Sequence, residues 1–380
     1  MTVPKRAPAF PTQVLSALVS GDTVAWPTLG VTPSEFLEVC AREDLIGLVH
    51  QRLRGSSEAG NWPQTLCDDL ARQARAQTAL ELVRHEELVS VLQALADAHV
   101  HPILLKGTPL AYEVYSAPAS RPRLDTDLLT RREALDGVRS AMVGLGYTAP
   151  TQCDGELLFY QFALARNDRY GVEHVFDFHW KISTQSVFAD LLTYDELAAD
   201  AVAIPALGPH AHGAGPVHAL LLACLHPVMH HRNLERIIWV YDIHLLASRL
   251  SAAELSQFAD LAIAKEVGAI CAYELALARS WFGTWIPDHL MRRLDSAGNE
   301  PSALYLGPGR RWHHEFVASV GGLRRWQDRL QLVTEVLVPS PRYMLGSYGV
   351  GNRAWGFALL PALYLHRNVR GIWKVLAGRK

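Results

Sequence analysis

Two acidic residues, Asp125 and Asp127, alternate with other residues in the sequence LDTDLL. We expect a strand over residues 123–130, and side chains of a strand point alternately to its two faces. Both carboxylates should therefore share one face, with Leu124 and Leu128 on the other face, in a core. Two neighbouring carboxylates repel each other, and a divalent cation relieves that repulsion.

A third acid fits the same site. Asp177 lies in the middle of VEHVFDFHWKI, which predicts a strand over residues 172–182. Carboxylates on adjacent strands form a hard, all-oxygen site that suits Mg²⁺. His179 stands two residues further along, where it either packs beside Asp177 or takes part directly.

Positive and anion-binding groups precede the acids. Lys106, Gly107 and Thr108 form a turn between a short apolar strand and a helix, where backbone N–H groups can face an anion. Lys106 either contacts a phosphate or simply ends the strand at the surface. Arg121 and Arg123 either fix triphosphate charge or brace the acidic strand, and the planar arginine group suits anions with several oxygens.

The ordered motifs LLKGTPLAYEVY, RPRLDTDLL and FDFHW resemble the nucleotidyltransferase superfamily of the polymerase-β type. The resemblance is closest to an uncharacterised bacterial family with a Leu-Lys-Gly turn, an Arg-x-x-x-Asp-x-Asp strand and an Asp-x-His-Trp strand. It covers residues 100–182 best. The one departure is Thr108, where the superfamily usually has serine or glycine.

The resemblance and the residues together imply a Mg²⁺-dependent enzyme that moves a nucleoside monophosphate from an NTP to an acceptor and releases pyrophosphate. Asp125 and Asp127 would hold two Mg²⁺ ions, and Asp177 would complete one metal site and help to activate the acceptor. Gly107 and Thr108 would bind the phosphates. The alternatives are a non-catalytic nucleotide-binding scaffold or regulator, and a kinase-like enzyme that transfers the γ-phosphoryl group at the same site.

The amino-acid composition and net charge of the chain indicate which kinds of acceptor to expect. The chain has 380 residues, of which 49% are hydrophobic and 19% charged, and its formal net charge is −2. This is ordinary globular composition without overall attraction for nucleic acid, so a small molecule or a peptide or protein is favoured as acceptor over long nucleic acid. We expect a cytoplasmic protein without a signal peptide or a membrane span. The scattered cysteines predict reduced core residues: Cys40, Cys67, Cys153, Cys224 and Cys271.

The order of elements predicts an α+β protein, with a small mixed sheet flanked by helical regions. We expect an N-terminal helical region over residues 1–100, a nucleotidyltransferase core over 101–205 and a C-terminal helical domain over 206–380. Capping-box patterns predict helices that begin near Thr32 and Ser251. The Gly- and Pro-rich stretch 206–215 is the predicted connector.

Two further features have ordinary structural explanations beside the functional ones. His226 and His230 are four residues apart on an expected helix, but no third zinc ligand is evident, so a structural or substrate-facing role is favoured. The C-terminal stretch 355–380 combines large apolar residues with Arg and Lys. It predicts either a last packed helix or a basic amphipathic surface for a membrane, RNA or a peptide.

Overall fold

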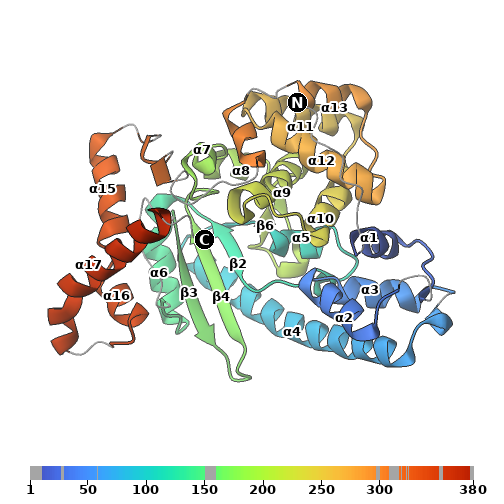
Figure 1. Ribbon diagram of the computed structural model, residues 1–380, viewed down its shortest axis with the longest axis horizontal. Coiled ribbons are helices and arrows are strands. Elements are labelled where there is room, and N and C mark those ends of the chain that lie inside the picture. Colours follow the sequence, from blue (N-terminus) through green and yellow to red (C-terminus); the bar gives the residue numbers. More distant parts are fainter. Residues whose placement is uncertain are drawn as a thin grey trace.

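The computed structural model describes residues 11–26, 30–57, 59–149, 160–296, 300–307, 316, 317, 319–321, 323, 325–350 and 354–376. The fold is α+β, as predicted: a six-stranded mixed sheet lies among helices from both ends of the chain (Figure 1). No helix in these ranges is apolar over enough turns to cross a membrane.

The sheet has the strand order β3-β4-β2-β1-β6-β5. β2 runs parallel to β4 and antiparallel to β1, and β3 and β4 form an antiparallel hairpin. In the β2–β4 register, Asp127 is the direct partner of Asp177. The strands are β1 (Ile103–Leu104), β2 (Thr126–Leu129), β3 (Gln161–Asn167), β4 (Glu173–His179), β5 (Val202–Ala203) and β6 (His212–Gly213).

The strands predicted near residues 103, 126 and 175 are confirmed, with shorter ends. The third predicted strand, over 156–166, is observed as β3, and residues 150–159 lie outside the described part of the chain. The predicted connector 206–215 contains β6, which pairs with β1. The division into three domains stays a prediction.

One expectation about the core is wrong. Leu124 was expected to point into the core with Leu128, but its side chain is 84% exposed, whereas Leu128 is fully buried. The reason is that β2 begins at Thr126, so Leu124 and Asp125 precede the strand and do not follow its alternation.

Helices before the sheet include the 34-residue α4, which connects two hydrophobic cores. Its first half contributes Leu66 and Leu70 to the core beneath the N-terminal helices, and its second half contributes Leu88 and Leu92 to the core behind the sheet. The predicted capping box at Thr32 is present. These helices are α1 (Thr12–Ser20), α2 (Pro33–Arg42), α3 (Ile46–Arg54), the 3₁₀ helix η2 (Ala59–Asn61) and α4 (Gln64–Asp97).

Short helices connect the strands. They are α5 (Gly107–Glu113), η3 (Pro118–Ser120), η4 (Arg132–Ala134), α6 (Leu135–Gly144), α7 (Ser186–Ala189), α8 (Tyr194–Ala199) and η5 (Pro205–Leu207). Among them, α5 begins directly after β1 and so places the predicted Lys-Gly-Thr turn beside β2.

The predicted helical pair after the connector is observed as α9 and α10, and the capping box at Ser251 opens α11. These helices share one hydrophobic core with the N-terminal helices. The helices are α9 (Pro216–His231), α10 (Ile237–Ala247), α11 (Ala252–Ala264), α12 (Gly268–Phe282), α13 (Asp288–Asp295) and η6 (Pro301–Leu306).

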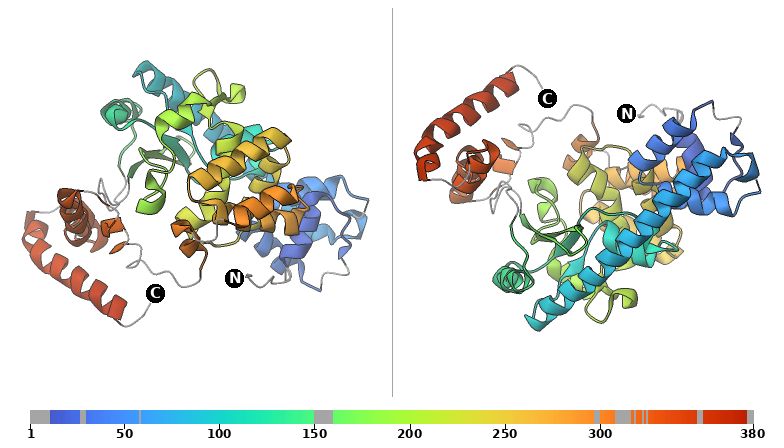
Figure 2. Two further views of the ribbon diagram at one scale, coloured as in Figure 1. Left: turned by 90° about the horizontal axis from the view of Figure 1, so that it is seen from above. Right: turned by 90° about the horizontal axis from the view of Figure 1, so that it is seen from below.

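The last three helices lie to one side of the rest, as both views in Figure 2 show (red). They are α15 (Trp326–Leu337), α16 (Pro341–Ser347) and α17 (Ala354–Leu376). The described part of the helix predicted over 311–337 is thus mainly α15, and residues 311–315, 318, 322 and 324 lie outside the described part of the chain. On α17, Phe357, Val369 and Trp373 are exposed, so this helix is not a fully packed one.

Glu274 on α12 is an acid buried in the core of the C-terminal helices, and its protonation affects stability. It is 1% exposed, and its Oε2 has no hydrogen-bond partner among the described residues. Burial, together with the nearby Glu235 carboxylate, raises the pKa of Glu274 to about 8. The folded protein therefore keeps a proton here that the unfolded chain loses near its ordinary pKa of about 4.3.

We expect the free energy of unfolding to fall as pH rises between about 5 and 8, by on the order of 1 kcal/mol per pH unit from this residue. Glu274→Gln should remove that part of the slope, because glutamine cannot ionise. Urea unfolding at pH 5, 6.5 and 8 measures it. Identical slopes for the two proteins would contradict the buried, protonated state.

Candidate active site

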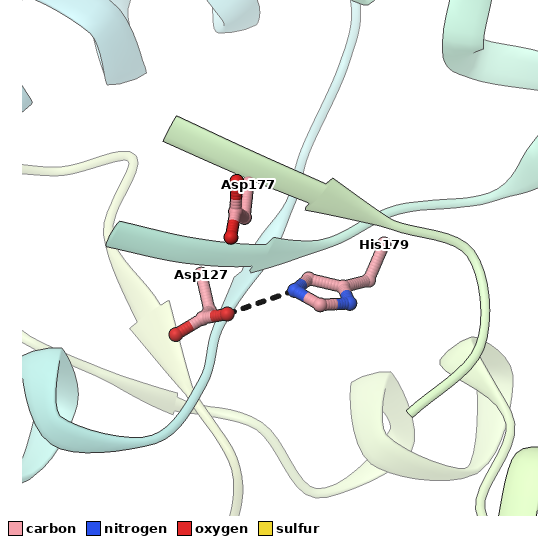
Figure 3. Close-up of side chains that lie close together, drawn as sticks. All are labelled: Asp127, Asp177 and His179. Carbon is pink, nitrogen blue, oxygen red and sulfur yellow. Dashed lines mark hydrogen bonds and ion pairs between the residues drawn. The ribbon is translucent and has the colours of Figure 1, made fainter. Parts of the chain in front are cut away.

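The register of β2 and β4 brings three of the polar side chains together. Asp127 is 4% exposed, and Asp177 beside it is half-buried. His179 is fully buried two residues further along β4, and its Nε2 lies 2.8 Å from Asp127 Oδ1 (Figure 3). Possible ligand atoms of all three residues lie within 4.8 Å of one another, and no other such group occurs in the described ranges. The arrangement is of the size that a single cation can bridge.

Lys106 contacts this group from the turn after β1. Its Nζ donates a hydrogen bond to Asp127 Oδ1 at 2.5 Å. Its backbone has φ 58° and ψ −134°, a conformation that residues with a Cβ rarely adopt. Such strain persists only where the surrounding structure enforces it, and it is common at functional sites. The strained backbone holds the lysine against the carboxylates.

The electrostatics of the group are unequal. Burial would raise the pKa of Asp127, but the Lys106 ammonium and the His179 hydrogen bond overcome this effect and hold it well below its ordinary value. Burial, followed by the charges of Asp127 and Asp125, raises the pKa of Asp177 to about 7. Burial lowers the pKa of His179, which favours the neutral imidazole. The cluster carries more negative charge than its own cations neutralise, and a bound divalent cation would relieve that excess.

Asp125 lies at the rim of this group. It keeps solvent exposure, because it precedes β2 on a bend, and it is absent from the closest set of ligand atoms. Partial desolvation and the charge of Asp127 raise its pKa, and its charge in turn acts on Asp177. The structure thus places it next to the buried pair, at the open side of the site.

The predicted turn follows Lys106 directly. Gly107 is half-buried, Thr108 is buried, and α5 begins at Gly107. A Cβ atom at Gly107 would lie 3.3 Å from the guanidinium carbon of Arg121, closer than most real contacts. Glycine at this position therefore lets the turn approach Arg121. Burial of Thr108 removes its hydroxyl from the surface where we expected a phosphate.

Arg121 is occupied by a buried ion pair. Its Nε and Nη2 donate to Asp242 of α10 at distances of 2.8–3.0 Å, and the Tyr115 hydroxyl donates to the same carboxylate at 2.6 Å. The arginine is 7% exposed and the aspartate 4%. This geometry favours the bracing alternative for Arg121 over direct triphosphate contact, because the guanidinium already has a bidentate carboxylate partner.

Arg123 braces the other side of the acidic segment. Its Nη2 donates to Glu81 of α4 at 2.9 Å, and its Nη1 donates to Thr126 Oγ1 at 2.7 Å. Arg84 donates to the carbonyl oxygen of Arg123. Both predicted phosphate-binding arginines are therefore engaged with acids from helices on either side of the core. In the sequence, Glu81 and Asp242 are single acids among apolar neighbours, and nothing there pairs them with Arg123 and Arg121.

His226 and His230 lie one turn apart on α9, with ring centroids 5.5 Å apart. His226 packs edge-on against Trp239. Neither histidine belongs to a group of three possible metal ligands within the described residues. This favours the structural or substrate-facing interpretation over a zinc site.

The comparisons with known proteins agree with the motifs. Residues 30–283 match the family model described as "Uncharacterised nucleotidyltransferase". The chain belongs to this nucleotidyltransferase family. The matched residues include the whole sheet, the three acids and helices α9 and α10. No curated protein and no solved structure matches the chain.

The brace between α10 and the turn can be tested by stability. Arg121→Met leaves the Asp242 carboxylate buried without its charged partner and should lower the free energy of unfolding by about 3–5 kcal/mol. The double variant Arg121→Met/Asp242→Leu should regain most of that loss, because it buries no lone charge. Urea unfolding measures both.

The matched control is Arg131→Met, which breaks the exposed pair of Arg131 with Asp195. An exposed pair contributes less than about 1 kcal/mol. A cost of Arg121→Met no larger than that of the control would contradict the bracing role.

Proposed function

We propose that this member of the nucleotidyltransferase family is a Mg²⁺-dependent enzyme that transfers a nucleoside monophosphate from an NTP to an acceptor and releases pyrophosphate. The observation that carries the proposal is the side-by-side placement of Asp127 and Asp177, with Lys106 held against Asp127 at the start of the glycine turn. Family membership supports the class of reaction.

The donor set fits magnesium. Carboxylate oxygens are the ligands that Mg²⁺ prefers, and burial, together with the charges of Asp127 and Asp125, raises the pKa of Asp177. We propose Asp127 and Asp177, together with Asp125 at the rim, as the residues that hold two ions. Mg²⁺ would supply neutralisation of the triphosphate and alignment of the α-phosphorus for in-line attack.

The residues of the chain have separate roles in this proposal. Lys106 would contact the phosphates beside the Gly107–Thr108 turn, once Asp127 serves as a ligand of the metal. His179 keeps the Asp127 carboxylate in position through its hydrogen bond. Arg121 and Arg123 hold the turn and the acidic segment in place through their buried acids.

The reaction itself is a single displacement. The acceptor oxygen attacks the α-phosphorus and forms the new P–O bond, while its proton passes to the Asp177 carboxylate. The bond between the α-phosphorus and the bridging oxygen breaks, and pyrophosphate leaves with the electron pair. Because the chain carries no excess of positive charge, we propose a small molecule or a peptide or protein as acceptor. We place this reaction in the cytoplasm.

Nucleotide binding is the first test. Isothermal titration with each of the four ribonucleoside triphosphates should show saturable binding of at least one of them in Mg²⁺. Removal of the metal with EDTA should weaken that binding at least tenfold, because the carboxylates then repel the triphosphate. Equal affinity with and without Mg²⁺ would contradict a carboxylate–metal site.

Asp125→Asn separates metal binding from folding. Because Asp125 is exposed, its replacement should change the free energy of unfolding by less than about 0.5 kcal/mol. It should still reduce Mg²⁺-dependent nucleotide binding at least tenfold. The control Asp195→Asn, another exposed acid, should change neither quantity. Wild-type nucleotide affinity in Asp125→Asn would remove this residue from the site.

The products distinguish nucleotidyl transfer from the other two classes. With the bound NTP labelled on the α-phosphate or the γ-phosphate, we expect the γ-label in pyrophosphate and the α-label in the acceptor. Turnover should fall at least a thousandfold in Asp127→Asn. A γ-label transferred to the acceptor, with a nucleoside diphosphate left behind, would indicate kinase-like chemistry instead. Nucleotide binding without either product would indicate a scaffold.

A further inference from the structure

A cavity of about 50 Å³ lies directly behind the Lys106–Gly107 turn. β1 and α5 form one wall, and α9 and α10 form the other. Most of its lining is apolar, with side chains such as Leu105, Leu110 and Met229. Because Lys106 both lines the cavity and contacts Asp127, the polar end of the cavity adjoins the carboxylate site.

The cavity also has a polar feature that the proposed chemistry does not use. His226 and His230 line it from α9, and His226 Nδ1 and His230 Nε2 are buried without a hydrogen-bond partner among the described residues. A buried polar atom left without a partner is unfavourable. Burial and the charge of Lys106 contribute to lowering the pKa of both imidazoles, so both are neutral. Neutral imidazole offers one donor and one acceptor nitrogen, and the tautomer decides which nitrogen has which role.

The combined features define a ligand. The apolar part of the cavity suits a short alkyl group, since about 50 Å³ is several times the roughly 10–15 Å³ that one water molecule needs by the same measure. A hydroxyl group can both donate and accept, so it satisfies either tautomer of a neutral histidine. A hydroxyl is also the group that attacks phosphorus in the proposed reaction.

We propose that this cavity binds the apolar part of a hydroxyl-bearing acceptor, with the hydroxyl directed along His230 and Lys106 toward Asp127 and Asp177. The proposal rests on the nucleotidyltransferase function proposed above. It names the acceptor class as a small, uncharged molecule or segment with a short alkyl group next to its hydroxyl. Charged acceptors are disfavoured, because Arg121 and Asp242 in the lining are paired with each other and burial raises the pKa of Glu113, the other acid of the lining, to about 7.

Primary alcohols from ethanol to hexanol are the probes, titrated into the wild-type protein by calorimetry. Each methylene that enters the cavity should tighten binding about fourfold, until the cavity is filled. Absence of saturable binding, or affinity that does not depend on chain length, would overturn the proposal.

Two substitutions localise the binding. Ala223→Leu places three more carbon atoms into the cavity lining and should weaken propanol binding at least tenfold. Ala219→Leu, one turn earlier on the same wall, should do the same and serves if the first variant does not fold. Ala253→Leu on α11 adds the same side chain at an exposed position and should leave propanol binding unchanged. Wild-type affinity in a folded cavity-filling variant would place the alcohol elsewhere.

The acceptor role has its own readout. With Mg²⁺ and an NTP labelled on the α-phosphate, label should appear in the alkyl ester of the nucleoside monophosphate, and Ala223→Leu should slow its formation at least tenfold. Saturable alcohol binding without label transfer would overturn the acceptor role.

Separate titrations of the NTP into the same variants keep the two proposals apart. If the wild-type protein binds no NTP, the proposed function is refuted. If it binds an NTP but shows neither saturable alcohol binding nor label transfer to the alcohol, only the role of the cavity is refuted.

Discussion

The buried carboxylate of Asp127 is the constraint on which the site depends. It lies in a β-strand with almost no access to solvent, and a carboxylate in that position is stable only with close partners. Lys106 and His179 supply them, the first from the turn after β1 and the second from β4. Because both contacts converge on the same oxygen, the turn and the two parallel strands are held in one arrangement. Asp177 is then held close to a negative charge, and its burial and that charge together raise its pKa.

The helices on either side hold this arrangement through two buried ion pairs. α4 reaches the start of β2 through Glu81 and Arg123, and α10 reaches the glycine turn through Asp242 and Arg121. Removing one partner of such a pair is costly, because the other charge remains buried. The long α4 and the C-terminal helices are therefore part of the site's geometry, in agreement with a family match that extends well beyond the sheet.

Much of the site could be predicted from local sequence. The alternation of acids, the glycine turn and the second acidic strand depend on neighbouring residues, so the motif order was enough to place Asp127 beside Asp177. The roles of Arg121 and Arg123 could not be decided in this way. Asp242, the partner of Arg121, lies 121 residues away, and Glu81, the partner of Arg123, lies 42 residues away. A single sequence contains no signal for such pairings. Leu124 was misplaced for a related reason: alternation predicts a face only within a strand, and β2 begins two residues later.

The cavity behind Lys106 is also a tertiary feature, since its two walls come from parts of the chain about one hundred residues apart. It connects the apolar interface between core and C-terminal helices with the polar site on the sheet. Lys106 lines the cavity and also contacts Asp127 of the polar site. In this account the fold places a charged donor site and an apolar acceptor site on two sides of one strained residue.

In the proposed reaction, Asp125, Asp127 and Asp177 hold Mg²⁺ against the triphosphate beside the Gly107 turn. A crystal structure with Mg²⁺ and an NTP analogue whose α,β-bridging oxygen is replaced by methylene tests it most directly. We predict metal density between the carboxylates of Asp127 and Asp177, and Lys106 turned from Asp127 to a phosphate oxygen. Metal or triphosphate bound away from these carboxylates, with the Lys106–Asp127 contact unchanged, would contradict the account.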